Sequence, residues 1–420
     1  MLALLGNLAF RRLFAASVAS QLGTVIGNMA FAYYLVDRFA SRPSLASVAE
    51  LMYSLPTLVV FWIVGVIADR FDRKHIAAYS DWIRALLTML LLIGIHYDFL
   101  SLCFALLFLR SAVSRLFGPA EMGLVQGSLL PAQYVQAAGF NQMVNALFML
   151  FGLSLGAAAY YWLGITGALL IDAISFVISG LLISTGRYPE AARIPNGKSR
   201  LKELKTSLIW SDLRQGFQYI YRNKLLFHLL HAFFFFGIVN GTFAVLPIFV
   251  MKYKLSPDNY LVHSSLIMVF LGVGFMAGSL MAPFLIQKFS KTNVLIAGFF
   301  IASMLTFAIG SVSSVPLYLG LILLIGVILA PANIVIGGWM PDIVIPQYMG
   351  KVNALTDPLM MLGHSLALGF VALAFPSWIS ITWLHYMLGI CMFGVSIYYF
   401  ARLPRLIAGR KQERSDGVSG

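Results

Sequence analysis

Long apolar runs separated by short polar segments dominate the chain. Scanned with a window of about 19 residues, the sequence holds twelve stretches that approach the roughly 20 apolar residues of a bilayer crossing. Six of them precede a long polar segment at 187–224, and six follow it. The pattern predicts an all-α membrane protein with twelve transmembrane helices in two six-helix bundles. The predicted helices cover 13–36, 48–68, 76–95, 100–117, 138–163, 164–184, 225–250, 264–286, 294–311, 317–339, 358–375 and 379–400.

Composition narrows the class of protein further. Hydrophobic residues make up 60% of the 420 positions and charged residues only 11%, whereas soluble domains average about 45–50% and about 25%. That balance excludes a soluble globular enzyme. Cys103 and Cys391 each lie within an apolar run, so neither a disulfide framework nor a metal site is expected. The Gly-Lys-Ser triplet at 197–199 has Ala192 where a phosphate-binding loop requires glycine, so ATP-driven activity is not supported.

The formal net charge of +13 raises the question of a nucleic-acid partner, which would need a basic soluble face. If the N-terminus is cytoplasmic, 23 of the 29 Lys and Arg residues fall in segments on the cytoplasmic side. Lys and Arg concentrate on that side of membrane proteins. The excess charge therefore indicates topology: a multi-pass protein of the cell membrane with both termini cytoplasmic, a lipid bilayer around it and no nucleic-acid partner.

The order of the segments predicts four regions. We expect an N-terminal six-helix bundle at 1–186, a cytoplasmic linker at 187–224, a C-terminal six-helix bundle at 225–403 and a cytoplasmic tail at 404–420. Leucines at helical spacing between basic residues in the second part of the linker predict an amphipathic helix that lies on the inner leaflet. We interpret it as a linker helix rather than a regulatory site.

The two halves also resemble each other in sequence. Asn28, Phe31 and Ala32 recur 212 positions later, and the Gln-Tyr pair at 133–134 recurs 214 positions later. A nearly constant offset is what an ancient duplication leaves, and a repeat of two six-helix halves is one of the known transporter architectures.

A motif follows the second predicted helix. Its fixed positions are Gly65, Asp69, Arg70, Arg73 and Lys74. Gly65 permits a close helix contact, Asp69 can accept charge-assisted hydrogen bonds, and the basic residues keep the loop inside. The motif resembles the Gly-x-x-x-Asp-Arg-x-x-Arg-Lys signature of the major facilitator superfamily, at the place between helices 2 and 3 that the family expects.

Further motifs resemble the drug:proton antiporter branch of that superfamily, which contains the macrolide-efflux proteins. They are Phe-Leu-Arg-Ser at 108–111, Pro-Ala at 119–120, Leu-Pro at 130–131 and Ile-Asp-Ala-Ile-Ser-Phe at 171–176. The sequence differs from the pattern of that branch at two positions. The helix 5 segment Gly-Leu-Ser-Leu-Gly at 152–156 is followed by Ala157 rather than Pro, and Ser114 replaces the Gly that usually comes four residues after Arg110.

The resemblance implies the major facilitator fold and transport by alternating access, in which two bundles rock about a central site. It also implies that Asp69 and its basic neighbours close the cytoplasmic side against the start of helix 11, whose helix dipole favours an anion. That role is gating and involves no contact with the substrate.

Charges inside a membrane are costly and point to function. Arg110 and Asp172 lie about 3 Å apart in depth, at a helical rise of about 1.5 Å per residue, so they can pair; by this count they are the only charged residues deep in the bilayer. Arg110 is a candidate for a substrate or coupling role. Asp172 is either a second candidate for that role or a structural acid that holds helices together. Asp81 and Arg84 are expected to form an intrahelical pair. Asp357 is a further coupling candidate, although Pro358 behind it suits a helix N-cap.

Two other groups of residues are interpreted from position alone. Ser47 and Glu50 have the spacing of a capping box at the start of helix 2. The family places helices 1, 4, 7 and 10 around the cavity, and polar and aromatic positions on them would suit a largely apolar, neutral or cationic compound. The cavity candidates are Gln21, Asn28, Phe31, Ser114, Phe236, Asn240 and Asn333.

Three functions remain open at this point. The first is a monomeric secondary exporter of a hydrophobic small molecule, such as a drug or metabolite, which uses the proton gradient and no cofactor. The second is an importer or uniporter of a polar solute on the same scaffold. The third is a membrane-embedded enzyme or a non-transporting sensor, but no zinc-ligand pattern or nucleophile–base cluster stands out to support catalysis.

Overall fold

The computed structural model describes residue 4 and residues 6–130, 133–194, 214–215, 217–344 and 346–416. Helices account for nearly all of these residues, and no strand occurs among them. The chain divides into two compact units, Met1–Lys205 and Thr206–Gly420, and the division falls inside the polar segment at 187–224. Residues 195–213, which hold most of the expected linker helix, lie outside the described residues.

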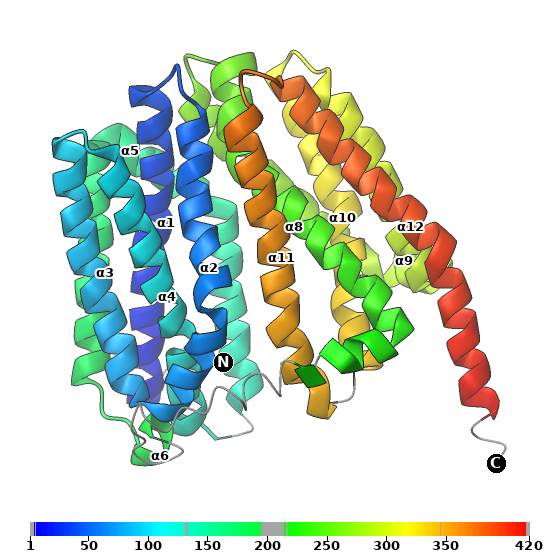
Figure 1. The fold of residues 1–420 in the computed structure, drawn as a ribbon, viewed down its shortest axis with the longest axis horizontal. Coiled ribbons are helices and arrows are strands. Elements are labelled where there is room, and N and C mark those ends of the chain that lie inside the picture. Colours follow the sequence, from blue (N-terminus) through cyan, green and yellow to red (C-terminus); the bar gives the residue numbers. More distant parts are fainter. Residues whose placement is uncertain are drawn as a thin grey trace. The chain divides into compact units, whose positions relative to one another are not determined.

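The N-terminal unit contains α1 to α6 (Figure 1). Their bounds are α1 Leu8–Arg38, α2 Ser44–Arg70, α3 Arg73–His96, α4 Leu100–Ser128, α5 Tyr134–Thr185 and α6 Glu190–Arg193. The C-terminal unit contains α8 Lys224–Val250, which continues as a short π-helix at Met251–Leu255, followed by α9 Tyr260–Gly310, α10 Val315–Ile343, α11 Pro346–Ala374 and α12 Ile381–Asp416. Residues 404–416, expected to belong to a tail, continue α12.

Ten helices among the described residues are long and apolar enough to cross a membrane. Two of these helices are broken. α5 has 52 residues and α9 has 51, so at about 1.5 Å per residue each would be more than twice as long as a bilayer core is thick. The breaks fall at Gly164 (φ 64°) and Ser290 (φ 71°), where left-handed or extended backbone dihedrals end one segment and start the next. The described spans are therefore compatible with the twelve predicted helices.

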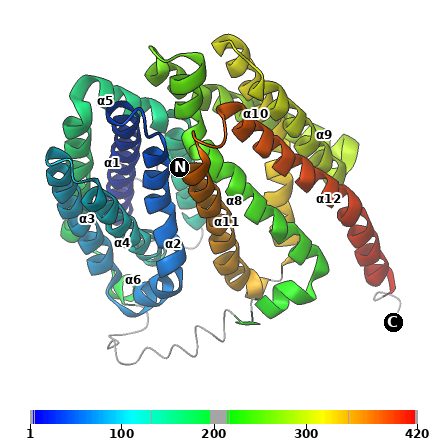
Figure 2. The ribbon, with the colours of Figure 1, turned by 45° about the horizontal axis from the view of Figure 1, so that its top comes forward.

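The same pattern of helix packing occurs in both units. In the N-terminal unit α1 packs on α5, while α3 packs on α4 and α5. In the C-terminal unit α8 packs on α11 and α12, and α9 packs on α10 and α12; α9 and α12 run side by side in Figures 1 and 2. In both units the first helix thus packs on the part of the chain that ends the unit, as expected of a repeat.

Glycines bring the helices close together within each unit. A Cβ on Gly27 of α1 would lie 2.7 Å from Asp172 Oδ2 on α5. In the C-terminal unit, Gly241 of α8 packs against the backbone of His364 on α11, where a Cβ would lie 2.9 Å from its Cα atom. Small residues let membrane helices approach closely, since no hydrophobic effect drives them together in lipid.

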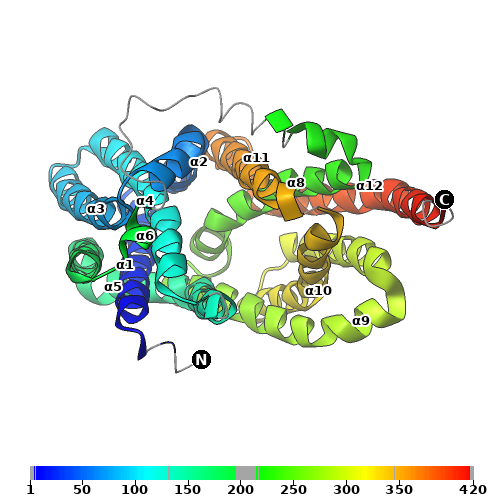
Figure 3. The ribbon, with the colours of Figure 1, turned by 90° about the horizontal axis from the view of Figure 1, so that it is seen from below.

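The end of the N-terminal unit near α6 is tied together by polar contacts. Asp72 caps α3 by accepting a hydrogen bond from Lys74 N (3.0 Å), and it forms an ion pair with Arg193 of α6. Arg12 Nη1 donates to the carbonyl of Thr185 at the end of α5 (2.8 Å). Figure 3, a view from below, shows α6 near the ends of α1 and α4. These contacts attach the segment that follows α5 to the end of the N-terminal bundle.

Candidate functional site

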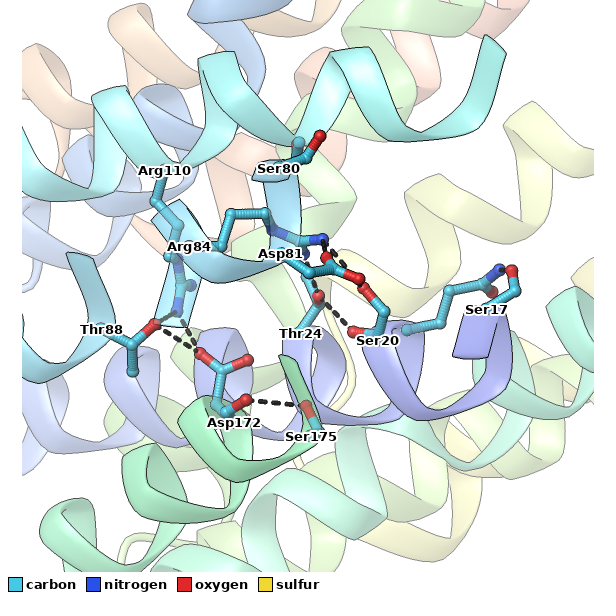
Figure 4. A network of polar contacts seen from close by, with 12 residues as sticks. Ser17, Ser20, Thr24, Ser80, Asp81, Arg84, Thr88, Arg110, Asp172 and Ser175 are labelled. Carbon is cyan, nitrogen blue, oxygen red and sulfur yellow. Dashed lines mark hydrogen bonds and ion pairs between the residues drawn. The ribbon is translucent and has the colours of Figure 1, made fainter. Parts of the chain in front are cut away.

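Two buried ion pairs lie inside the N-terminal unit (Figure 4). The first joins Arg110 of α4 to Asp172 in the second segment of α5, and the side chains of both are at most 5% exposed. The predicted pairing of these two residues is therefore confirmed. Arg110 is also bonded through Nη2 to the Asn28 side chain of α1. One guanidinium thus connects three helices.

Thr88 of α3 joins the first pair to a fourth helix. Its hydroxyl donates to Asp172 Oδ2 (3.3 Å) and accepts from Arg110 Nη1 (3.2 Å). Asp172 Oδ2 is therefore engaged twice, whereas Asp172 Oδ1 is buried and has no hydrogen-bond partner in the described part of the chain. The carboxylate keeps one oxygen available to bind a proton or a ligand.

The second pair is Asp81 with Arg84, at 2.9 Å and three residues apart on α3. This intrahelical pair was predicted and is confirmed. Ser20 of α1 bridges the two charges, because its hydroxyl donates to Asp81 Oδ1 (3.1 Å) and accepts from Arg84 Nη1 (2.9 Å). Thr24 accepts from Arg84 Nη2 (2.5 Å).

The Arg84 guanidinium also lies 3.9 Å from the centroid of the Phe176 ring on α5. Stacking of a desolvated cation on an aromatic face is favourable. Phe176 comes four residues after Asp172, so one face of α5 serves both pairs. The two arginines and two aspartates together carry no net charge, which is how several charges can stay buried in an apolar bundle.

More charged groups are buried than the sequence analysis expected. Arg110 and Asp172 are not the only ones, since Asp81 is 0% and Arg84 is 4% exposed. Glu121 was missed because the predicted fourth helix ended at 117, whereas α4 continues through Pro119 to Ser128. Glu121 is 8% exposed, and its carboxyl group lies near Ser17 of α1.

Arg115 is a correction of the same kind. The 23 Lys and Arg residues counted as cytoplasmic from the sequence include Arg115, but it lies inside α4, where its Nη2 donates to the Tyr53 carbonyl of α2 (3.3 Å). A guanidinium held by a backbone carbonyl within a helix pair is part of the bundle interior, and it gives no information on which side of the membrane the loop lies.

Two predicted caps are wrong. α2 begins at Ser44, and no side chain caps its N-terminus, so Ser47 and Glu50 lie within the helix instead of forming a capping box. α11 begins at Pro346 and contains Pro358, so Asp357 is an exposed residue in the interior of that helix and not an N-cap.

The signature motif between α2 and α3 is described only in part. Gly65, Asp69 and Arg70 lie in the last turns of α2, and their side chains lie outside the described part of the structure. The guanidinium of Arg73 lies flat against Gly123 of α4, where a Cβ would come within 2.5 Å of Cζ. Lys74 is half-buried at the start of α3. The predicted gating role stays a prediction.

The remaining cavity candidates are spread over both units. Gln21 Nε2 donates to Ser17 Oγ (3.1 Å), and Ser114 Oγ donates to the Ser111 carbonyl (2.7 Å). Phe31 is fully buried in an apolar cluster with residues such as Leu35, so it packs inside the unit and does not line an open wall.

In the C-terminal unit, Asn240 and Asn333 are exposed. Phe236 packs on Phe299 with ring centroids 5.3 Å apart, and both rings line a small apolar pocket between α8, α9 and α12. No polar side chain lines that pocket apart from the thiol of Cys391. The buried ion pairs described above lie in the N-terminal unit.

Polar residues recur along one side of α1, and this is a signal that the sequence analysis did not use. Ser17, Ser20, Thr24 and Asn28 follow one another at intervals of three or four in an otherwise apolar helix. That spacing places them on one helix face, where three of them contact the buried ion pairs or Glu121 directly and Asn28 holds Arg110.

Taken together, a two-unit bundle of membrane-spanning helices with a repeated packing pattern and buried ion pairs defines a multi-pass membrane transporter. The sequence profile of the Major Facilitator Superfamily matches residues 13–368. The chain belongs to that superfamily.

Comparison with individual relatives agrees. The chain is 48% identical over 403 residues to the uncharacterized MFS-type transporter YkuC of Bacillus subtilis, covering 96% of this chain and 94% of that protein. It is 26% identical to macrolide efflux protein A of Streptococcus pyogenes, over 87% and 89% of the two chains.

Solved structures share the fold at low sequence identity. A bacterial homologue of the iron transporter ferroportin, in an inward-facing state, matches with a TM-score of 0.72 at 14% identity, over 94% of this chain and 98% of that chain. The nucleoside transporter NupG matches with a TM-score of 0.69 at 15% identity, over 94% and 99% of the two chains.

Proposed function

We propose that the protein exports a hydrophobic small molecule, a drug or a metabolite, in exchange for protons by alternating access. It works as a monomer without a cofactor, in the cell membrane, with both termini in the cytoplasm. The observation that carries this proposal is the Arg110–Asp172 pair, buried among four helices with one carboxylate oxygen unengaged. Ionisable residues inside membrane helices mark ion pathways and proton relays.

The proposal assigns coupling to Asp172 and its partner Arg110. A proton on Asp172 would neutralise the carboxylate and weaken its hold on the guanidinium, so that protonation changes the contacts between α1, α3, α4 and α5. A network that links four helices through one titratable group can convert proton binding into a change of helix packing. Asp357, exposed within α11, is the coupling candidate of the other unit.

Export of hydrophobic compounds is supported by the similarity to macrolide efflux protein A, at 26% identity over most of both chains. The largely apolar surroundings of Phe236 in the C-terminal unit agree with an apolar substrate.

Inside-out vesicles that contain the protein test both parts of the proposal. The vesicles are energised with a proton gradient and offered erythromycin, ethidium and uridine in turn, while a pH-sensitive dye reports proton release. We expect accumulation of a hydrophobic probe together with proton release, and loss of both after a protonophore. Accumulation without proton movement would overturn the antiport, and transport of uridine alone would favour an importer or uniporter of polar solutes.

The gating motif provides a second test in the same vesicles. Asp69→Asn removes the charge that the motif uses while it preserves the size of the side chain. We expect impaired transport and normal insertion into the membrane, with Asp98→Asn at an exposed loop as the matched control. Normal transport by Asp69→Asn would show that the gating assignment is wrong.

A further inference from the structure

The first half of α2 carries a row of buried polar atoms without partners. Ser47 Oγ, Glu50 Oε1, the Tyr53 hydroxyl and Thr57 Oγ1 are closed off from solvent, and none forms a hydrogen bond in the described part of the chain. Intervals of three or four residues place these atoms on one face of the helix. Glu50 stands out among them because it is an acid that is only 9% exposed.

A buried carboxylate without a partner is costly, so such a group takes up a proton or binds ordered water. Two cations of α4, Arg110 and Arg115, lie near this face, and neither forms a salt bridge with Glu50, although the buried Nε of Arg115 has no hydrogen-bond partner among the described residues. Arg110 is bonded to Asp172 and Asn28, and Arg115 Nη2 donates to the Tyr53 carbonyl (3.3 Å). No salt bridge reaches Glu50 from the described residues of any helix that packs on α2.

Tyr53 connects Glu50 to the Arg110–Asp172 pair. It lies one turn after Glu50 on the same face of α2. The Arg110 Cζ atom is 6.0 Å from the centroid of the Tyr53 ring. Tyr53 therefore lies beside Arg110 of the pair and one helical turn from Glu50. Glu50 and Asp172 each have one buried oxygen without a hydrogen-bond partner among the described residues.

We propose that Glu50 is a proton-binding site that exchanges protons with Asp172 through Tyr53 and ordered water along this face of α2. The proposal rests on the proposed proton-driven function. In one transfer the O–H bond of Glu50 breaks as Tyr53 gains that proton, and the original phenolic proton of Tyr53 passes to Asp172 Oδ1. Every electron pair stays on its oxygen, and the net change is one proton moved from Glu50 to Asp172.

The orientation proposed above gives this path a direction. α2 starts on the external side and α4 runs inward from Leu100, so Glu50 lies nearer to the exterior than the Arg110–Asp172 pair. Glu50 would then receive protons from outside and deliver them to the coupling residue.

Infrared difference titration tests the site with protons as the only ligand. The purified full-length protein is placed in liposomes of phosphatidylethanolamine and phosphatidylglycerol, and the stretch of protonated carboxyl groups is recorded across pH. We expect Glu50→Gln to remove one carboxyl band that is present at neutral pH, and Asp98→Asn to leave that band unchanged. The same carboxyl bands in Glu50→Gln and the wild type would overturn the proposal. Because Gln mimics the protonated acid, this variant should fold.

Transport separates this proposal from the one on which it rests. In the vesicle assay we expect Glu50→Gln and Tyr53→Phe to lower proton release per accumulated probe at least tenfold, while probe exchange without a proton gradient persists. Wild-type proton release in the Glu50→Gln variant would overturn the role of Glu50. If the wild type accumulates a probe without proton release, the antiport fails, and the infrared titration still decides whether Glu50 binds a proton.

Discussion

Asp172 lies at the centre of the buried network, and its replacement gives the sharpest test of the structure. Asp172→Asn keeps the shape of the side chain but removes the charge that neutralises Arg110. The Arg110 guanidinium is then left in a bundle where it is only 4% exposed. Breaking a buried ion pair by removing one partner costs about 3–5 kcal/mol, because the remaining charge is uncompensated.

A double-mutant cycle separates the interaction energy of Arg110 and Asp172 from the other effects of each substitution on stability. Arg110→Gln alone leaves Asp172 uncompensated and should cost about as much as Asp172→Asn. The double variant Arg110→Gln/Asp172→Asn places two neutral amides opposite each other, so it should be more stable than the sum of the two losses predicts. We expect a coupling energy at the upper end of the roughly 0.5–3 kcal/mol that neighbouring groups show.

The free energy of unfolding is measured by denaturant titration of the purified variants in detergent micelles, with circular dichroism at helix wavelengths. Asp98→Asn serves as the control, since its partner Arg38 is exposed and exposed pairs contribute about 0–1 kcal/mol. Additive losses within about 0.5 kcal/mol would refute the reasoning, because they would mean that the two side chains do not stabilise each other.

Three further outcomes are expected. Gly27→Val should destabilise the N-terminal unit and lower thermal stability, because even the first added carbon would lie 2.7 Å from Asp172 Oδ2; wild-type melting would contradict the packing of α1. Partial burial raises the pKa of the Asp72 carboxyl, but the hydrogen bonds and the positive charge of Arg193 outweigh burial and lower that pKa. This pair should stabilise the fold above the unfolded-state pKa, and the effect should vanish as pH falls through the folded-state pKa; Asp72→Asn should therefore lose stability relative to the wild type above that range and differ from it less below it. Lys254→Met should lower the melting temperature by removing the 2.6 Å hydrogen bond to the last carbonyl of α9.

The apolar pattern was sufficient to predict the spans but not where helices stop. The break at Gly164 was placed correctly, because a glycine between two runs of span length permits a dihedral that other residues resist. The predicted end at 117 followed the end of an apolar run, whereas the predicted start at 358 relied on proline at the first position of a helix. Both were wrong, since α4 continues through Pro119 and α11 contains Pro358. Neighbouring helices satisfy the freed backbone groups in membrane proteins.

The capping box failed for a related physical reason. A capping box at Ser47 and Glu50 requires that the helix begins there and that its first backbone amides need acceptors. α2 begins three residues earlier, at Ser44, so these side chains have no amide to cap and lie on the buried face. The sequence identifies residue types that can cap, but the start of the helix depends on how far the hydrophobic bundle extends.

Pairing between helices was predicted only where charge and depth both pointed to it. Arg110 and Asp172 are opposite charges at one depth, and that suffices to predict an ion pair. The contributions of Thr88 and Asn28 could not be inferred in this way, because a neutral side chain carries no sign that identifies its partner. Their roles follow from packing, in which Gly27 lets α1 approach α5 closely enough for Asn28 to reach Arg110.

The same packing explains why a proton at this site would be felt throughout the unit. Asp172 meets Arg110 of α4 and Thr88 of α3 through one oxygen, and it lies against Gly27 of α1. Close-packed interiors have few voids and transmit strain between neighbouring side chains. A change in the charge of Asp172 is therefore expected to alter its contacts with α1, α3 and α4 together. A side chain that contacted only one helix would not have this effect.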